Sequence, residues 1–181
     1  MTDMFTNAKK PFYESTSFSY LSKLPVPVYS AFIKEKFESA GKTIDDDSIS
    51  FIIEWTKDHT YYTQRLCNEV FSLSGNDIVR NDIVTAIQSI LDSERDRFQE
   101  IRRLVTRSQW KMLEALAKEG SVSQITSSAF LSKYKISSGP TALRNIKALM
   151  DKELVLVMTT DDGTSYSVYN VFLSRYLEMN R

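Results

Sequence analysis

Gly41-Lys42-Thr43 is the first grouping in this chain whose residue types could do chemistry, since it matches the end of a phosphate-binding loop. That motif needs a second glycine five positions before Gly41, and Lys36 stands there. The loop should also follow a buried strand and open a helix, whereas this tripeptide closes a run of apolar residues at helical spacing. We therefore interpret Gly41 as a helix C-cap rather than as part of a nucleotide site.

The chain's single histidine and single cysteine, His59 and Cys67, could form a nucleophilic pair or contribute to a metal site. One residue of each type excludes a multi-histidine site, a structural zinc site and an internal disulfide. The two residues lie eight positions apart, which is ~12 Å along a helix axis and too far for a nucleophile and its base. We interpret Cys67 as a buried structural thiol.

Two runs of aspartate, Asp45-Asp46-Asp47 and Asp161-Asp162, could bind a cation through their carboxylates. A run of this kind more often begins a helix, where the macrodipole favours negative charge, or occupies a turn. The sequence therefore predicts no catalytic residue, no metal ligand and no cofactor bound by this chain alone.

A basic stretch is the grouping that most favours a binding function. Residues 126–150 contain four lysines and arginines and no acidic residue, and this local positive charge attracts phosphates. If the stretch forms a helix-turn-helix, the second helix of that motif enters the major groove of DNA. The candidate nucleic-acid contacts are Lys133, Lys135, Ser137, Ser138, Thr141, Arg144, Asn145 and Lys147.

These candidates differ in what they could recognise. An arginine such as Arg144 can bind guanine and an asparagine such as Asn145 can bind adenine, whereas Lys147 suits phosphate. Asp161 and Asp162, at the expected tip of the hairpin that follows, would repel a DNA backbone. Double-stranded DNA and a protein therefore both stay open as partners of this region.

Helices are expected to position these residues in the first part of the chain. Pro25 and Pro27 suit a first helical turn, the apolar residues that follow keep helical spacing, and Gly41 ends the run. Further helices are predicted over residues 45–55, 61–73 and 82–105. The charged part of the last helix, residues 92–103, is interpreted as a solvated connector between two units.

In the second part of the chain, the apolar period changes from helical to alternating near Leu154. Helices are predicted over 106–120, 126–134 and 141–152, strands over 154–158 and 166–171, and a last helical turn or two over 172–177. The Asp162-Gly163 pair is a hairpin signal. In the third of these helices, the residues expected to be buried are Leu143, Ile146, Leu149 and Met150. This order of elements predicts a winged helix-turn-helix domain.

Size and composition are those of a globular protein with one or two domains. The chain has 181 residues, no net charge and few glycines and prolines, which argues against disorder. We assign residues 1–24 to an aromatic-rich N-terminal segment, 25–105 to a helical domain, and 106–181 to the winged helix, which carries ten basic and seven acidic residues. The sequence has no signal peptide and no run of about 20 apolar residues, so we expect a cytoplasmic protein with no membrane partner.

Part of the helical domain resembles the lid of archaeal-type AAA+/STAND ATPases. The segment that carries the resemblance is Asp58-His59-Thr60-Tyr61-Tyr62-Thr63-Gln64-Arg65-Leu66, which is similar to a G-H-P-x-Y-x-Q-x-L stretch of that family. Residues 4–5 and 11–13 resemble the piece after the family's sensor-1 strand, and residues 27–37 resemble its first lid helix. The winged helix resembles the domain that follows the lid. The chain departs from the pattern at Asp58 and Thr60, where the family often has Gly and Pro.

The resemblance implies an ATPase divided into an α/β nucleotide-binding core, a helical lid and a winged helix. This chain would supply the lid and the winged helix, and ATP would be bound through a phosphate-loop core that is missing or separately encoded. The family's sensor-2 arginine falls at Tyr61 here, and Arg65 lies one helical turn further on. Tyr61 and Arg65 are therefore the residues that the resemblance assigns to the nucleotide.

The function that the resemblance favours is regulatory and non-catalytic for this chain alone, with the lid coupling the nucleotide state to a DNA or protein partner. A free-standing winged-helix DNA-binding regulator is one alternative. A protein-interaction module is another, and it would use an exposed apolar patch among Phe5, Phe12, Tyr13 and Phe18. The fold class predicted is mainly α, with a lid-like helical bundle followed by a winged helix-turn-helix domain and its small β-hairpin.

Overall fold

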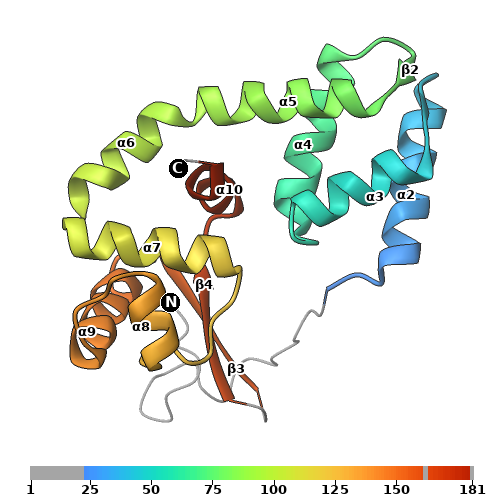
Figure 1. Ribbon diagram of the computed structural model, residues 1–181. Helices are drawn as coiled ribbons and strands as arrows, with labels where there is room; N and C mark the ends of the chain where they lie inside the picture. The colour runs from blue at the N-terminus through green and yellow to red at the C-terminus, as the bar shows by residue number, and fades with distance from the viewer. Residues whose placement is uncertain (1–22, 161–162, 180–181) are drawn as a thin grey trace, which may run out of the picture.

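The computed structural model describes residues 23–160 and 163–179, and it is mainly helical with a small antiparallel hairpin (Figure 1). Residues 1–22 of the aromatic-rich segment, with the apolar patch predicted there, and the hairpin tip 161–162 lie outside the described residues. The N-terminal helical unit consists of α2 (Val26–Ser39), β1 (Thr43–Ile44), α3 (Asp46–Trp55), α4 (Thr60–Leu73), β2 (Asp77–Ile78) and α5 (Arg80–Ser93). The winged-helix unit consists of α7 (Arg107–Glu119), α8 (Ser128–Lys133), α9 (Gly139–Met150), β3 (Val155–Thr160), β4 (Gly163–Val168) and α10 (Val171–Met179). The helix α6 (Arg95–Leu104) joins the two units.

In the N-terminal unit, helices begin and end at the residues that the local sequence signals indicate. Asp45 caps α3, because its carboxylate accepts a 2.6 Å hydrogen bond from the backbone N–H of Ser48. Gly41 follows the end of α2 with a φ of +77°, as a C-cap requires. The Lys42 ammonium donates hydrogen bonds of 2.8 and 2.7 Å to the carbonyls of Phe71 and Ser74, at the end of α4. The Gly-Lys-Thr tripeptide therefore has the structural role that its context predicted.

The long helix predicted over 82–105 is interrupted at Glu94, which ends α5 and precedes α6. The charged stretch is also more than a solvated connector. Phe98 of α6 is completely buried, and its ring centroid lies 5.0 Å from that of Tyr176 in α10. Phe98, Ile101 and Leu104 keep helical spacing in α6, but the charged residues around them led the stretch to be interpreted as a connector.

Serine and threonine caps begin the helices of the winged-helix unit. Thr106 and Gln109 form a capping box, in which each side chain accepts a hydrogen bond from the other residue's backbone N–H. The Ser127 hydroxyl caps α8 and the Ser138 hydroxyl caps α9, each by accepting a backbone N–H. The strands β3 and β4 pair antiparallel with Val155 opposite Val168. The predicted helix order and the predicted wing are therefore confirmed.

The burial predicted for the third helix of this unit is only half right. Ile146 and Leu149 are buried in α9, but Leu143 is 52% exposed and Met150 is 41% exposed. Successive helical residues differ by about 100° in direction, so the residues that follow Ala142 and Leu149 turn away from the buried stripe. The sequence alone did not fix which side of this mixed helix faces the core.

The last helix, α10, brings the end of the described chain back to the N-terminal helical unit, at the end of α3. In Figure 1 it lies within an arch formed by α5, α6 and α7, between the two units. Its buried residues include Phe172, Leu173 and Leu177, and it packs against α7. Within the described residues, no helix is both long enough and apolar enough to cross a membrane.

Gly120 ends α7 in a backbone conformation that suits glycine. Replacing it tests whether this glycine stabilises the helix end. Its φ is +77°, and an added Cβ would meet no atom within 4 Å, so the cost of a side chain would come from the backbone alone. We expect Gly120→Ala to lower the free energy of unfolding by about 1 kcal/mol. Gly75→Ala is the matched control, because Gly75 has equal space and no positive φ. Equal urea midpoints for the two variants would contradict the assignment.

Candidate functional site

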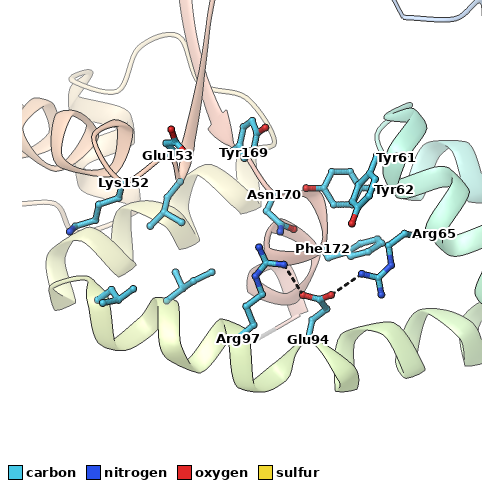
Figure 2. A pocket seen from close by; sticks show the side chains of 13 residues that line it. Tyr61, Tyr62, Arg65, Glu94, Arg97, Lys152, Glu153, Tyr169, Asn170 and Phe172 are labelled. Atoms are coloured by element: carbon cyan, nitrogen blue, oxygen red, sulfur yellow. Dashed lines mark hydrogen bonds and ion pairs between the residues drawn. The ribbon is translucent and has the colours of Figure 1, made fainter. Parts of the chain in front are cut away.

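A cleft with a volume of about 560 Å³ lies between the N-terminal helical unit and the winged-helix unit. Its walls come from three places: the start of α4, the charged helix α6 with Glu94, and the segments that flank the wing (Figure 2). The residues that line it include Tyr61, Tyr62, Arg65, Glu94, Arg97, Lys152, Glu153, Tyr169, Asn170 and Phe172. Both residues that the resemblance assigned to the nucleotide, Tyr61 and Arg65, therefore line this cleft.

A carboxylate with two arginines lies at the floor of the cleft. Glu94 accepts a 2.9 Å hydrogen bond from Arg65 of α4 and a 3.4 Å hydrogen bond from Arg97 of α6 (Figure 2). The Glu94 side chain is only 13% exposed, whereas that of Arg97 is 65% exposed. Because Glu94 also forms the break between α5 and α6, the pair with Arg65 fixes the junction of these helices to α4.

Aromatic rings form the side of the cleft nearest to α4. Phe172 of α10 is buried, and its ring centroid lies 4.8 Å from that of Tyr62 and 5.9 Å from that of Trp55. Burial raises the pKa of Tyr62, so its phenol stays protonated at neutral pH. Tyr61 is 54% exposed beside it. The arrangement offers a partly exposed ring and a guanidinium side by side, which is suited to a ligand with both a flat ring and an anionic group.

The guanidinium of Arg175 in α10 ties the winged-helix unit to the end of α3. It donates a 2.7 Å hydrogen bond to the carbonyl of Trp55 and a 2.9 Å hydrogen bond to the carbonyl of Glu54. Its third contact is a 2.7 Å ion pair with Glu178. Lys57, which follows α3, makes a second connection, because its ammonium donates hydrogen bonds to Ser174 and Glu178 of α10. Cations at the C-terminal end of a helix satisfy carbonyls that have no partner within the helix.

The predicted nucleic-acid contacts are only partly together on one surface. Arg144 and Lys147 are exposed on α9 and form no ion pair with any described residue. Lys133 is also exposed, but it pairs with Glu119 at 2.6 Å, and this bond raises the pKa of Lys133. Lys135 is exposed at the end of the α8 turn. The surface that remains for a polyanion is therefore small.

Three further candidates have structural roles in α9. Asn145 is 7% exposed, and its amide donates a 2.7 Å hydrogen bond to the Ser108 hydroxyl. The Asn145 side chain therefore faces the core and joins α9 to the start of α7, while the base contact stays a prediction. Ser138 and Thr141 are occupied with the cap of α9, where their hydroxyl oxygens lie 2.9 Å apart.

His59 and Cys67 both pack against other side chains of the N-terminal helical unit. His59 packs its ring against Tyr62, with centroids 4.7 Å apart. Cys67 lies on α4 beside residues of α2, and burial raises the pKa of its thiol to about 12. In the part of the chain that the structure describes, no cluster of three or more His, Cys, Asp or Glu side chains could hold a metal ion.

The raised pKa of Cys67 predicts an unreactive thiol. Only the thiolate is nucleophilic, so we expect the folded protein to react with Ellman's reagent at pH 8 roughly tenfold or more slowly than the urea-unfolded chain. Because the folded pKa exceeds the ordinary value of 9.0, the neutral thiol favours the folded state below pH 9, and this contribution is lost as the pH rises towards 12. Equal labelling rates in the folded and unfolded chains would contradict burial of this group.

Sequence reasoning missed Arg97, Phe172 and Arg175 as site residues. Arg97 lay in the stretch interpreted as a connector, and Phe172 and Arg175 lay in what was predicted only as a last helical turn. No local motif marks them, because each acts on residues from another part of the chain. The only signal available in the sequence was the presence of aromatic residues near its C-terminal end.

Comparisons with known proteins agree with this architecture. A family model described as "Probable winged helix domain" matches residues 96–179, and a comparison with curated proteins found no match. The chain is similar to a solved structure, a Walker-type ATPase of Pyrococcus abyssi, with a TM-score of 0.65 and 13% sequence identity. The match covers 97% of this chain and 48% of the ATPase chain, so this chain spans about half the length of the structure it matches. The chain thus joins a helical unit to a winged-helix domain, and it shares this fold with about half of a Walker-type ATPase.

Proposed function

We propose that this chain is the regulatory part of an ATP-binding protein. Its N-terminal helical unit acts as a lid over a nucleotide that a phosphate-loop core supplies, and its winged helix passes the nucleotide state to a partner. The chain does not hydrolyse ATP by itself. The similarity in fold to half of a Walker-type ATPase supports this proposal, since it leaves the remaining half of that protein to be supplied by a core.

The observation that carries the proposal is the attachment of α10 to the end of α3. A lid can move a winged helix only if the two are mechanically connected. Arg175 joins them through two backbone carbonyls, and Phe172 joins them through its contact with Trp55. A displacement of α3 therefore moves α10, and α10 packs on α7 of the winged-helix unit.

Arg65 provides the input to this connection. It bonds to Glu94 at the break between α5 and α6, and its guanidinium lies 5.7 Å from the centroid of the Phe172 ring. A nucleotide phosphate at the cleft would compete with Glu94 for the same guanidinium. Release of Glu94 would free the α5–α6 junction, and the change would reach the winged helix through α6 and α10. Nucleotide binding would thereby be converted into a movement of the output domain.

The experiment begins with the source of the nucleotide. The protein is expressed with an affinity tag from its native locus and purified. We expect a phosphate-loop domain in the purified sample at equal stoichiometry, either in the same polypeptide or in a co-purified protein. The purified chain alone is expected to show no ATP turnover above a protein-free blank. Turnover by the chain alone, or the lack of any associated phosphate loop, would overturn the proposal.

The coupling is tested in the same assembly by amide hydrogen exchange. Replacing ADP by ATP is expected to change the exchange of α9 in the unmodified protein and not in the Arg175→Met variant, which lacks the bonds to α3. Arg102→Met is the matched control, since Arg102 lies on α6 and has no bond to α3 among the described contacts. A nucleotide response that survives Arg175→Met would exclude α10 as the connection.

A second function, a winged-helix DNA-binding regulator, is favoured by the two exposed cations on α9. This function predicts salt-dependent binding of duplex DNA that is lost when Arg144 and Lys147 are both replaced by alanine. Absence of binding at about 50 mM salt, where electrostatic binding is strongest, would remove it.

A further inference from the structure

The surface of α9 that faces solvent combines apolar and basic side chains. We use the name α9 face for Leu143, Arg144, Lys147 and Met150. Leu143 and Met150 are 52% and 41% exposed, and the two cations between them in sequence are exposed as well. Residues seven apart lie about 10 Å apart along a helix and point in nearly the same direction. The two apolar side chains therefore form the ends of one stripe, with Lys147 between them.

This composition fits a protein partner better than it fits DNA. Proteins that bind DNA neutralise roughly 6–10 phosphates, and the α9 face offers two cations. Asn145, the side chain suited to adenine, is buried, and the nearby Lys133 is neutralised by Glu119. Bound to DNA, the exposed side chains of Leu143 and Met150 would lie against phosphates or a polar groove, where their burial would add little to the affinity. On the outward face of the expected recognition helix, Arg144 is thus the member of the α9 face whose residue type best suits a base edge.

We propose that the α9 face binds an amphipathic acidic helix of a partner protein. This inference rests on the proposed function, in that α9 is the surface through which the winged helix acts. Apolar residues on one stripe of the partner helix would cover Leu143 and Met150, as in other helix–helix contacts. Aspartate or glutamate beside that stripe would pair with Arg144 and Lys147.

The charge pattern sets the identity of the partner. Within the described residues, neither Arg144 nor Lys147 forms an ion pair that would have to be broken. Acidic residues on the partner would therefore gain contacts at no cost to the fold, while basic residues would be repelled. The apolar ends supply affinity and the central cations select the partner by charge.

The test uses a displayed library of helices on one small helical scaffold. Leucine is fixed at two positions seven residues apart, and the positions beside this stripe are varied among Asp, Glu, Lys, Arg and Ser. With the full chain as bait, we expect enriched clones to carry acidic residues at the varied positions. With the Arg144→Glu, Lys147→Glu bait, we expect the preference to reverse to Lys and Arg.

Affinities measured by fluorescence anisotropy complete the test. Leu143→Asp is expected to weaken a selected acidic clone by roughly tenfold or more, whereas Lys118→Glu, a charge change on the exposed side of α7, leaves it unchanged. The inference would be overturned if no clone were enriched, or if the charge-swapped bait did not reverse the preference. It would also be overturned if the same residues bound a DNA duplex of about 20 bp, roughly two helical turns, more tightly than the selected clone. The proposed function would survive any of these results, because it is tested by the associated phosphate loop and by ATP turnover.

Discussion

Replacing Phe172 by alanine is expected to lower the free energy of unfolding by about 3–5 kcal/mol. The side chain is 2% exposed, and it contacts the rings of Trp55 and Tyr62 in the N-terminal helical unit. The loss has two parts: the transfer of a large apolar side chain from the core, and the cavity left where three aromatic rings meet. Urea denaturation followed by far-ultraviolet circular dichroism measures the change.

The same variant is expected to loosen the winged-helix unit from the N-terminal helical unit. Phe172 connects them, so amide exchange should rise at the end of α3 and in α10 before it rises in α9. Met179→Ala is the control on the same helix, because Met179 is 59% exposed and its loss should change stability by less than about 0.5 kcal/mol. Similar effects from the two variants would mean that α10 does not dock as described.

Replacing Phe98 by alanine is expected to cost a similar amount, about 3–5 kcal/mol. Phe98 is completely buried and is the one buried residue of α6, which is otherwise charged or partly exposed. A ten-residue helix is not stable alone in water, so α6 depends on this side chain for its position. The contact with Tyr176 shows that the anchor is made against α10.

The response to Phe98→Ala should be concentrated in α6. Hydrogen exchange of the α6 amides is expected to rise more than that of α7, because α7 keeps its own buried face and capping box. Leu104→Ala is the matched control on α6, since Leu104 is 71% exposed. If Leu104→Ala and Phe98→Ala gave equal changes in the urea midpoint, α6 would be a solvated connector after all.

These two side chains explain how one short helix holds the molecule together. Phe172 and Tyr176 lie four residues apart on α10, one against the N-terminal helical unit and the other against α6. Arg175 lies between them and bonds to α3. The coupling that we propose between the nucleotide state and the winged helix therefore depends on three contacts of α10, made by Phe172, Arg175 and Tyr176.

Much of the fold could be predicted from the sequence because its signals are local. Each helix end depends on residues only a few positions apart in the chain. Examples are the Thr106 capping box, the Ser127 and Ser138 caps, and the helix ends at Gly41 and Gly120. The change from helical to alternating period at Leu154 likewise marked the wing. Helix ends and hairpins are determined by backbone hydrogen bonds of this short range, so a single sequence contains them.

The candidate site was predicted less well, since its residues come from separate elements. Tyr61 and Arg65 were identified only through a resemblance, and their neighbours Arg97 and Phe172 were missed. Asn145 was assigned to DNA because its residue type suits adenine, but residue type does not say which way a side chain faces. Its burial against Ser108 depends on how α9 packs on α7.

The sequence by itself determined where most helices start and stop, and that a wing follows the third helix of the second unit. Only the tertiary structure decided that α10 returns to α3, with Arg175 bonded to a carbonyl 120 positions away. It also decided that Leu143 faces solvent while Asn145 faces the core. The physical reason is that the local signals are hydrogen bonds between near neighbours, whereas burial depends on which distant surface each helix covers.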